Sequence, residues 1–188
     1  MKPRVVVGIS GASGAAIGVR AVELLNGLGA ETHLVVSRAA ERTLLDEVGP
    51  DAAARLRASA SYWLAVDDIG ANIASGSFPT QGMIVAPCSM RTLGAIANCL
   101  SDTLLARAAD VHLKERRPLV LLAREAPLHL GHLRAMTVAT EAGAIVMPPV
   151  PAFYLRPASV AEIIDQIARR AIDLLHVFEP LASQWHGS

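Results

Sequence analysis

The sequence opens on an apolar run, Val5–Val7 and Ile9, whose β-branched side chains are typical of a buried strand. Residues 8–14 then hold three glycines and two serines, and a helical pattern follows over 15–28. A strand, a glycine-rich turn and a helix in this order direct backbone N–H groups towards an anion. A tight turn with close helix packing fits equally well, because the spacing is not G-x-G-x-x-G and the P-loop lysine is missing.

Apolar runs and helical periodicity continue to alternate along the rest of the chain. Further strands are expected at 31–37, 82–86, 118–123 and 144–147. Helices are expected at 38–48, 51–60, 90–97, 102–116, 128–142 and 159–175. Asp102 and Ser159 are the expected N-caps of two of these helices, and 61–80 is expected to be an irregular loop. The alternation predicts a single-domain α/β fold with a doubly wound parallel sheet, whose ligands bind at the carboxyl ends of the strands.

Composition adds information about the surface. Of the 188 residues, 52% are hydrophobic, and only 18% are charged, against a usual ~25%. Part of the surface is therefore expected to be covered by other subunits, with a compact alanine-rich monomer as the alternative. The 17 basic residues balance the 17 acidic ones, which gives no electrostatic footprint for nucleic acid or an anionic membrane.

The cysteines and the N-terminal residues indicate in which cellular compartment the protein is expected. Cys88 and Cys99 form neither a C-x-x-C motif nor a metal cluster, which is typical of a reduced, cytoplasmic protein. The chain enters its first strand almost at once, so no signal peptide is expected. No apolar run approaches the ~20 residues that a membrane-spanning helix needs, so no membrane insertion is expected.

The residues that follow the predicted strands are the candidates for chemistry. They are Ser10–Gly14, Ser37, Pro87–Thr92, Arg124 with Glu125, and Pro148–Tyr154. Small hydroxyl residues and glycines come first, and an adjacent pair of opposite charges appears only after the fourth strand. This distribution suits a ligand that combines a phosphate with a flat polar ring.

Several of these residues have a purely structural explanation beside the functional one. Ser89 opens a helix, which makes either a second anion-binding N-terminus or a simple N-cap. Arg124 and Glu125 either bind a phosphate and move a proton, or form a surface ion pair. On the last helix Arg169 points away from the apolar face, while Arg170 lies at its edge, partly desolvated, as a ligand or as a snorkelling arginine.

Two further features have mainly structural explanations. Lys114 belongs to the charged run 114–117 at a helix end, where basic residues complement the helix dipole. His129 and His132 are three positions apart, but no carboxylate or third ligand has a suitable spacing, so no metal site is expected there.

Six blocks in one order make the sequence recognisable, and together they resemble the UbiX/Pad family of flavin prenyltransferases over nearly the whole chain. The blocks are 8–15, 82–89, 107–111, 113–121, 124–128 and 148–154. Several long blocks in one order are far more specific than any single glycine motif. The segment 98–103 departs from the pattern that is usual in the family.

The resemblance implies a flavodoxin-like (Rossmann-like) α/β domain over residues 1–175. It also implies that copies of the chain assemble into a homo-oligomer with twelve subunits, a dodecamer. It implies a C-terminal tail, 176–188, that packs at a subunit interface. The implied activity is transfer of a dimethylallyl group from dimethylallyl phosphate to reduced FMN, without a metal. The product, prenylated FMN, is the cofactor of a UbiD-type decarboxylase.

The resemblance also assigns residues to the site. FMN would be held by Gly11, Ala12, Ser13, Ser37, Ser89, Met90, Arg91, Thr92 and Arg124. The phosphate of the prenyl donor would be surrounded by Ser13, Lys114, Arg124, Tyr154 and Arg170. Glu47 and Glu125 match acidic positions of the family's site, with Glu125 as the acid/base, and Trp185 matches an aromatic residue of its tail. The cationic residues would offset the charge that develops on the leaving phosphate.

Two other functions fit parts of the sequence. A cysteine decarboxylase of the same superfamily would have a catalytic histidine early in the chain and a cysteine near its end. Here His33 lies inside the second predicted strand, and no cysteine follows Cys99. A non-catalytic FMN-carrier subunit of an aromatic acid decarboxylase would share the flavin site. An enzyme is favoured by four retained residues: Lys114, Glu125, Tyr154 and Arg170.

Overall fold

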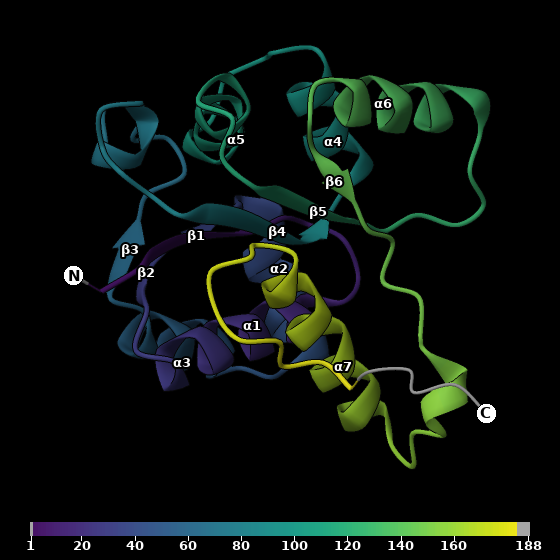
Figure 1. Ribbon diagram of the computed structural model, residues 1–188. Helices are drawn as coiled ribbons and strands as arrows, with labels where there is room; N and C mark the ends of the chain where they lie inside the picture. Colours follow the sequence, from purple (N-terminus) through teal and green to yellow (C-terminus); the bar gives the residue numbers. More distant parts are fainter. Residues whose placement is uncertain (1, 184–188) are drawn as a thin grey trace.

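One parallel sheet of six strands lies at the centre of the computed structural model, which describes residues 2–183 (Figure 1). The strands are β1 (Arg4–Ile9), β2 (Glu31–Val36), β3 (Tyr62–Leu64), β4 (Gly82–Cys88), β5 (Leu119–Ala123) and β6 (Ile145–Val146). They are arranged in the order β3-β2-β1-β4-β5-β6. The doubly wound α/β fold is therefore confirmed.

Five of these strands were predicted, and they stand in the 2-1-3-4-5 order of a flavodoxin-like sheet. The sixth, β3, lies in the segment 61–80, where the prediction of a purely irregular loop was wrong. Three residues are too few to show a period. The strand exists because it pairs with His33–Val35 at the edge of the sheet, a contact between segments far apart in the sequence.

Seven helices and two 3₁₀ turns flank the sheet in the described part of the chain. The helices are α1 (Ala15–Gly27), α2 (Arg38–Glu47), α3 (Ala52–Ser59), α4 (Met90–Ala97), α5 (Leu104–Lys114), α6 (Leu130–Glu141) and α7 (Val160–Asp173). The 3₁₀ turns are η1 (Asn72–Ala74) and η2 (Phe153–Leu155). Helices α1, α2, α3 and α7 cover one face of the sheet, and α4, α5 and α6 cover the other (Figure 1).

The central strand β1 supplies both cores. Val5, Val7 and Ile9 pack in the cluster beneath α1 and α7, whereas Val6 packs in the cluster beneath α4 and α5. All four side chains are fully buried. Successive residues of a strand face opposite sides, so a strand covered on both faces needs the continuous apolar run with which the sequence opens.

The helix N-caps test the sequence prediction closely. Ser159 caps α7 as predicted, because its side chain accepts a hydrogen bond from the N–H of Glu162. For α5 the prediction of Asp102 was wrong, since the Thr103 hydroxyl accepts the N–H of Ala106 at 3.2 Å. Asp102 instead pairs with Arg91 at 2.9 Å.

The strand ends meet at the topological switch point between β1 and β4, where the strand order reverses. The Ser10 hydroxyl donates to the carbonyl of Pro87 at 2.9 Å and accepts the N–H of Ser89 at 2.7 Å. The N–H of Ser37 donates to the carbonyl of Ile9 at 2.9 Å. The predicted convergence of these segments at the carboxyl edge is confirmed.

The end of the described chain, 176–183, folds back on α7. The N–H groups of Leu181 and Ala182 donate to the carboxylate of Asp173 at 2.7 and 3.0 Å. Phe178 and Leu181 pack against the core beneath α1 and α7. Among the described residues, no helix combines the length and apolar character that crossing a membrane requires.

Candidate functional site

A cavity of about 500 Å³ opens at the switch point, and its size is within the range of small-molecule sites. Five residues that the resemblance assigns to FMN line it: Gly11, Ser37, Ser89, Arg91 and Thr92. Six further lining residues were not anticipated: Arg38, Ala39, Val66, Asp67, Asp102 and Thr103. Arg38 and Ala39 directly follow a predicted strand, so the strand-end rule could have found them. The other four reach the cavity only through tertiary packing.

Two helix N-termini open onto this cavity. The hydroxyl of Ser37 accepts the N–H of Ala40 at 3.1 Å, and that of Ser89 accepts the N–H of Thr92 at 3.3 Å. The structural explanation of Ser89 as an N-cap is therefore confirmed. The positive ends of the α2 and α4 dipoles also favour a negatively charged group in the same space.

Two arginines at the cavity are held by exposed carboxylates. Arg38 lies 3.5 Å from Asp67, and Arg91 lies 2.9 Å from Asp102. Exposed ion pairs of this kind contribute little to stability. An anionic ligand can therefore take the place of either carboxylate at a small cost in free energy. The pairs therefore keep two guanidinium groups close to the place where a phosphate would bind.

The glycine-rich loop lies beside this cavity and is shaped by close contacts. A Cβ on Gly11 would lie 2.3 Å from that of Ala39, so this position requires glycine. Ala12 donates its N–H to the carbonyl of Ser10 at 2.8 Å, and Ser13 is exposed. The loop therefore packs against the start of α2 and presents the Ser13 side chain at the surface.

The N–H groups at the start of α1 are occupied by a side chain of the protein. Gly14, the N-cap of α1, has a φ of 106° and offers no capping side chain. Oε2 of Glu47, the last residue of α2, accepts the N–H groups of Gly14 and Ala15, each at 2.9 Å. Glu47 is therefore close to the loop, as the resemblance implies, and part of the loop's anion-binding backbone is bound to its carboxylate.

Arg124 and Glu125 follow β5 at the same edge of the sheet. The N–H of Arg124 donates to the carbonyl of Cys88 at 3.0 Å, which fixes its backbone beside the end of β4. The Glu125 carboxylate accepts the N–H of Ala126 at 3.0 Å. Both side chains are exposed, and within residues 2–183 they form no ion pair with each other.

Two neighbours at the end of β4 are packing groups. Met90, the first residue of α4, is half-buried against the core beneath that helix. Cys88 is fully buried, and burial raises the pKa of its thiol to about 12. The thiol therefore stays protonated and is not a nucleophile at neutral pH.

Tyr154 and Arg170 lie together in a smaller cavity of about 150 Å³. Tyr154 belongs to η2, which follows β6, and Arg170 belongs to the last turn of α7. Val150 and Ile167 supply apolar walls. The structure thus unites two residues that the resemblance assigns to the prenyl donor, although the sequence separates them widely.

The expected burial of the two adjacent arginines on α7 was wrong. Arg170 is exposed, and Arg169 is the half-buried arginine of the pair. The reason is a hydrogen bond from Arg169 to Asp165, whose carboxylate also accepts from Arg20 of α1 at 2.8 Å. This network holds Arg169 against the α1–α7 contact and leaves Arg170 at the rim of the small cavity.

Lys114 does not join these residues within one chain. It ends α5 beside Gly76, where an added Cβ would lie 2.7 Å from Lys114 Nζ. Gly76 precedes β4, and β5 begins at Leu119, so Lys114 lies at the amino edge of the sheet. There it pairs with Glu115, whose carboxyl pKa is lowered by this hydrogen bond. Trp185 lies outside the described residues.

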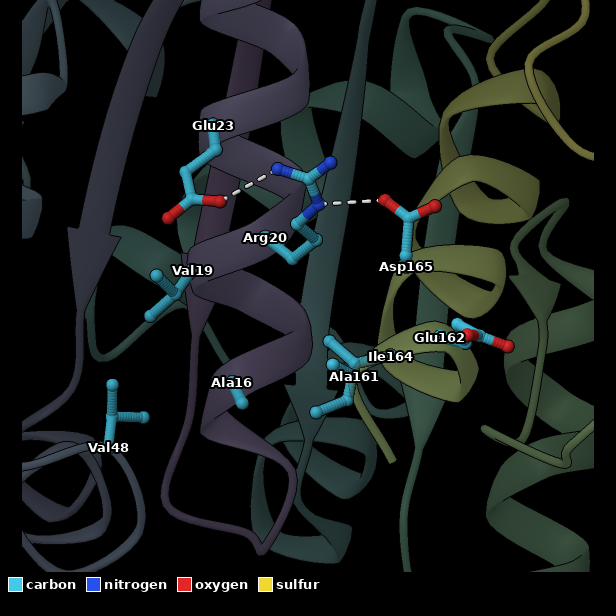
Figure 2. Close-up of a pocket in the computed structure, with 9 residues that line it drawn as sticks. All are labelled: Ala16, Val19, Arg20, Glu23, Val48, Ala161, Glu162, Ile164 and Asp165. Carbon is cyan, nitrogen blue, oxygen red and sulfur yellow. Dashed lines mark hydrogen bonds and ion pairs between the residues drawn. The ribbon is translucent and has the colours of Figure 1, made fainter. Parts of the chain in front are cut away.

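A third cavity, of about 430 Å³, lies between α1 and α7 (Figure 2). Val19 and Ile164 form part of its apolar wall. Arg20 lies between Glu23 and Asp165 and bonds both carboxylates, at 2.9 and 2.8 Å (Figure 2). Because this guanidinium is already neutralised, the cavity is less suited to a phosphate ligand than the one at the strand ends.

Comparison with known proteins shows the family to which the chain belongs. Residues 1–171 match the family model described as Flavoprotein, the class of protein that the fold and the switch-point cavity define. The chain is 52% identical over 189 residues to the flavin prenyltransferase UbiX of Escherichia coli (strain K12), covering 98% of this chain and 99% of the relative. The chain therefore belongs to the UbiX family of flavin prenyltransferases.

Two crystal structures extend the comparison. AnUbiX (PadA1), solved in complex with FMN and dimethylallyl pyrophosphate, is 45% identical with a TM-score of 0.95, and the match covers 100% of both chains. A dodecameric FMN-dependent UbiX-like decarboxylase from Escherichia coli O157:H7 is 42% identical with a TM-score of 0.92. That match covers 98% of this chain and 100% of the other.

Proposed function

We propose that this protein is a flavin prenyltransferase that transfers a dimethylallyl group from dimethylallyl phosphate to reduced FMN. The observation that carries the proposal is the cavity at the switch point. It gathers residues of three strand ends, Gly11, Ser37 and Ser89, in a chain that shares half of its sequence with a flavin prenyltransferase.

The residues present fit a flavin mononucleotide. Two serine-capped helix N-termini and the guanidinium groups of Arg38 and Arg91 suit its phosphate. Val66 and Ala39 give the same cavity apolar wall, which suits a flat ring. We assign FMN to this cavity, with Ser13, Met90 and Arg124 at its border.

The chemistry needs a nucleophilic flavin, a leaving phosphate and a dry pocket, and reduced FMN supplies the nucleophile when it is bound. Arg124 and Arg170 stabilise the negative charge that develops on the phosphate as the allylic C–O bond breaks. The Tyr154 hydroxyl donates a further hydrogen bond. Glu125 holds or moves the proton at its exposed carboxyl group, and Met90 excludes water.

The placement of Lys114 bears on assembly. A lysine at the amino edge of the sheet reaches a donor phosphate at the carboxyl edge only if it belongs to another copy of the chain. The low content of charged residues and the exposed apolar side chains of α6, Leu130 and Leu133 among them, support a homo-oligomer. We propose a dodecamer, as in the Escherichia coli O157:H7 relative, with the tail from residue 176 at a subunit interface.

The product would pass to a second protein. Prenylated FMN is the cofactor that the family resemblance assigns to UbiD-type decarboxylases, so we propose such an enzyme as the recipient, in the cytoplasm. A non-catalytic FMN carrier would share the cavity, but it would have no use for Tyr154 and Arg170, which lie together in a second cavity.

Anaerobic incubation tests the proposal directly. The full chain is mixed with reduced FMN, dimethylallyl phosphate and EDTA, and the flavin is analysed by mass spectrometry. Gain of one C5H8 unit by FMN is the expected result. If FMN binds but never gains this mass, the prenyltransferase activity is contradicted, and the non-catalytic FMN carrier is the function that remains.

A further inference from the structure

Arg117 joins the end of α5 to the loop 76–80, which leads into β4. Its Nη2 donates to the carbonyl of Gly76 at 2.6 Å, and its Nη1 donates to the carbonyl of Phe78 at 2.9 Å. Nη1 also donates to the hydroxyl oxygen of Thr80 at 3.1 Å. A guanidinium group presents its N–H donors in a rigid, planar fork, so these three bonds hold the loop in one place relative to α5.

A buried chain of hydrogen bonds connects the same loop to α5 a second time. Nδ1 of His112 lies 2.7 Å from the carbonyl oxygen of Ala108, and Nε2 lies 2.9 Å from the hydroxyl oxygen of Thr80. A carbonyl can only accept, so Nδ1 carries the proton and Nε2 accepts the hydroxyl proton of Thr80. The Thr80 oxygen is therefore free to accept the N–H of Arg117, and every member of the chain has a partner.

The backbone at the end of α5 brings Arg117 to this loop. The N–H of Arg117 donates to the carbonyl of His112 at 2.8 Å, and Arg116 has a φ of 54°, in the left-handed region. A left-handed residue followed by a bond back into the last turn ends a helix. The chain then enters β5, whose start pairs with the start of β4, where the loop also ends.

The loop in turn lies directly against the ion pair of Lys114 and Glu115. A Cβ on Gly76 would lie 2.7 Å from Lys114 Nζ and would also overlap the carboxylate of Glu115. The backbone of Gly76 therefore limits where the two charged groups can lie. Arg117 binds the carbonyl of the same glycine, so loss of its bonds would change the surroundings of Lys114.

We propose that Arg117 is a positioning residue, which fixes the place of the Lys114 ammonium group through the loop 76–80. The inference rests on the proposed function, in which Lys114 of one copy serves the site of another copy. A lysine side chain is long and flexible, so its charge reaches a fixed point in a neighbouring copy only if its surroundings restrain it. In this role Arg117 needs no contact with a ligand.

The kinetic test measures FMN prenylation and FMN binding separately. Arg117→Gln removes the guanidinium fork, and it is expected to lower kcat by between about 10-fold and 100-fold, the effect of a misplaced group. FMN affinity is expected to stay unchanged, because the FMN cavity lies at the opposite edge of the sheet. Arg116→Gln removes the exposed charge next to Arg117 and is the matched control, with kcat expected to be unchanged. An unchanged kcat in Arg117→Gln would overturn the proposal.

Co-expression of two variants shows on which side of the composite site Arg117 acts. With Arg124→Ala as the partner, Arg117→Gln should recover about a quarter of the unsubstituted activity, the share of sites that draw both halves from intact chains. With Lys114→Ala as the partner no recovery is expected, because every chain that contributes the lysine is then defective. Recovery with Lys114→Ala would place the effect of Arg117 in its own chain's flavin site and overturn the proposal.

Amide hydrogen exchange keeps the inference testable without catalysis. In Arg117→Gln the amides of 75–82 and 113–117 are expected to exchange several-fold faster, and those of 89–92 at the FMN cavity as in the unsubstituted protein. Equal exchange in 75–82 would overturn the inference. If Arg117→Gln fails to fold, Thr80→Val removes only the hydroxyl and should give the same pattern. If the unsubstituted protein forms no prenylated FMN, the proposed function fails, and the exchange data still decide whether Arg117 holds the loop.

Discussion

Gly11 leaves no room for a Cβ beside Ala39, and this predicts the effect of a single methyl group. In Gly11→Ala the new Cβ would lie 2.3 Å from the Cβ of Ala39 and 3.1 Å from its carbonyl carbon. Backbone and Cβ atoms cannot rotate away, so the loop and α2 must separate. We expect FMN affinity to fall at least ~10-fold and stability to fall by about 1–3 kcal/mol.

Fluorescence titration of FMN and urea unfolding measure these two effects. Gly27→Ala is the control, because a Cβ there meets no atom within 4 Å. That substitution is expected to leave FMN affinity unchanged. Equal FMN affinity in Gly11→Ala and the unsubstituted protein would show that the loop does not shape the flavin site.

A second residue, His112, predicts how stability depends on pH. Its ring is fully buried between the carbonyl of Ala108 at 2.7 Å and the hydroxyl of Thr80 at 2.9 Å. Burial lowers its pKa from 6.5 to about 4. Between these two pKa values the unfolded chain binds a proton at His112 and the folded chain does not. The free energy of unfolding therefore falls as the pH drops from about 6.5 to 4.

The expected loss from His112 approaches roughly 3 kcal/mol at the acid end of this window. Urea unfolding at a series of pH values measures it. His112→Gln should flatten the curve, although a slope from His33 remains, since burial lowers the pKa of that ring as well. A curve of unchanged steepness in His112→Gln would contradict the assignment.

At the scale of elements, the start of α5 gives a prediction about capping. The Thr103 hydroxyl accepts the N–H of Ala106, whereas Asp102 lies one residue earlier and pairs with Arg91. Thr103→Ala is expected to lower the free energy of unfolding by about 1 kcal/mol, and Asp102→Ala by a few tenths, because its ion pair is exposed. Chemical unfolding of both variants compares them, and a larger loss in Asp102→Ala would restore Asp102 as the cap.

The same element shows what local sequence could determine. Ser101, Asp102 and Thr103 are all N-cap residue types, so the sequence places a helix start here but not at one residue. The long apolar strands were predictable because burial on both faces imposes a continuous pattern. Strand β3 was not, because three residues gain their structure from pairing with β2.

The candidate site also has a part that the sequence could predict and a part that it could not. The strand-end rule brought the segments around Ser10, Ser37 and Ser89 together correctly, because parallel strands end at one edge. It could not foresee the hydrogen bond that Gly14 donates to Glu47, which depends on how α2 packs beside α1. Nor could helical periodicity decide between Arg169 and Arg170, since a carboxylate on α7 settles which arginine is covered.

At the scale of the whole molecule, the proposed site needs residues from more than one chain. Ser13 and Arg124 lie at the carboxyl edge of the sheet, and Lys114 lies at the amino edge. Exposed apolar side chains on α6 and at Phe153, which is 73% exposed, offer surface for contact between copies. If Lys114 serves the donor phosphate, an assembled site combines Lys114 from one chain with Arg124 from another.

This composite site predicts complementation between two inactive variants. Lys114→Ala and Arg124→Ala are each expected to lose at least ~100-fold in activity, because each removes a cation from the developing phosphate charge. In oligomers assembled at random from equal amounts of both, about one quarter of the sites receive an intact Lys114 and an intact Arg124 from different chains. Activity should therefore return to about a quarter of the unsubstituted level. Had both residues acted within one chain, every site would carry a defect and the mixture would stay inactive.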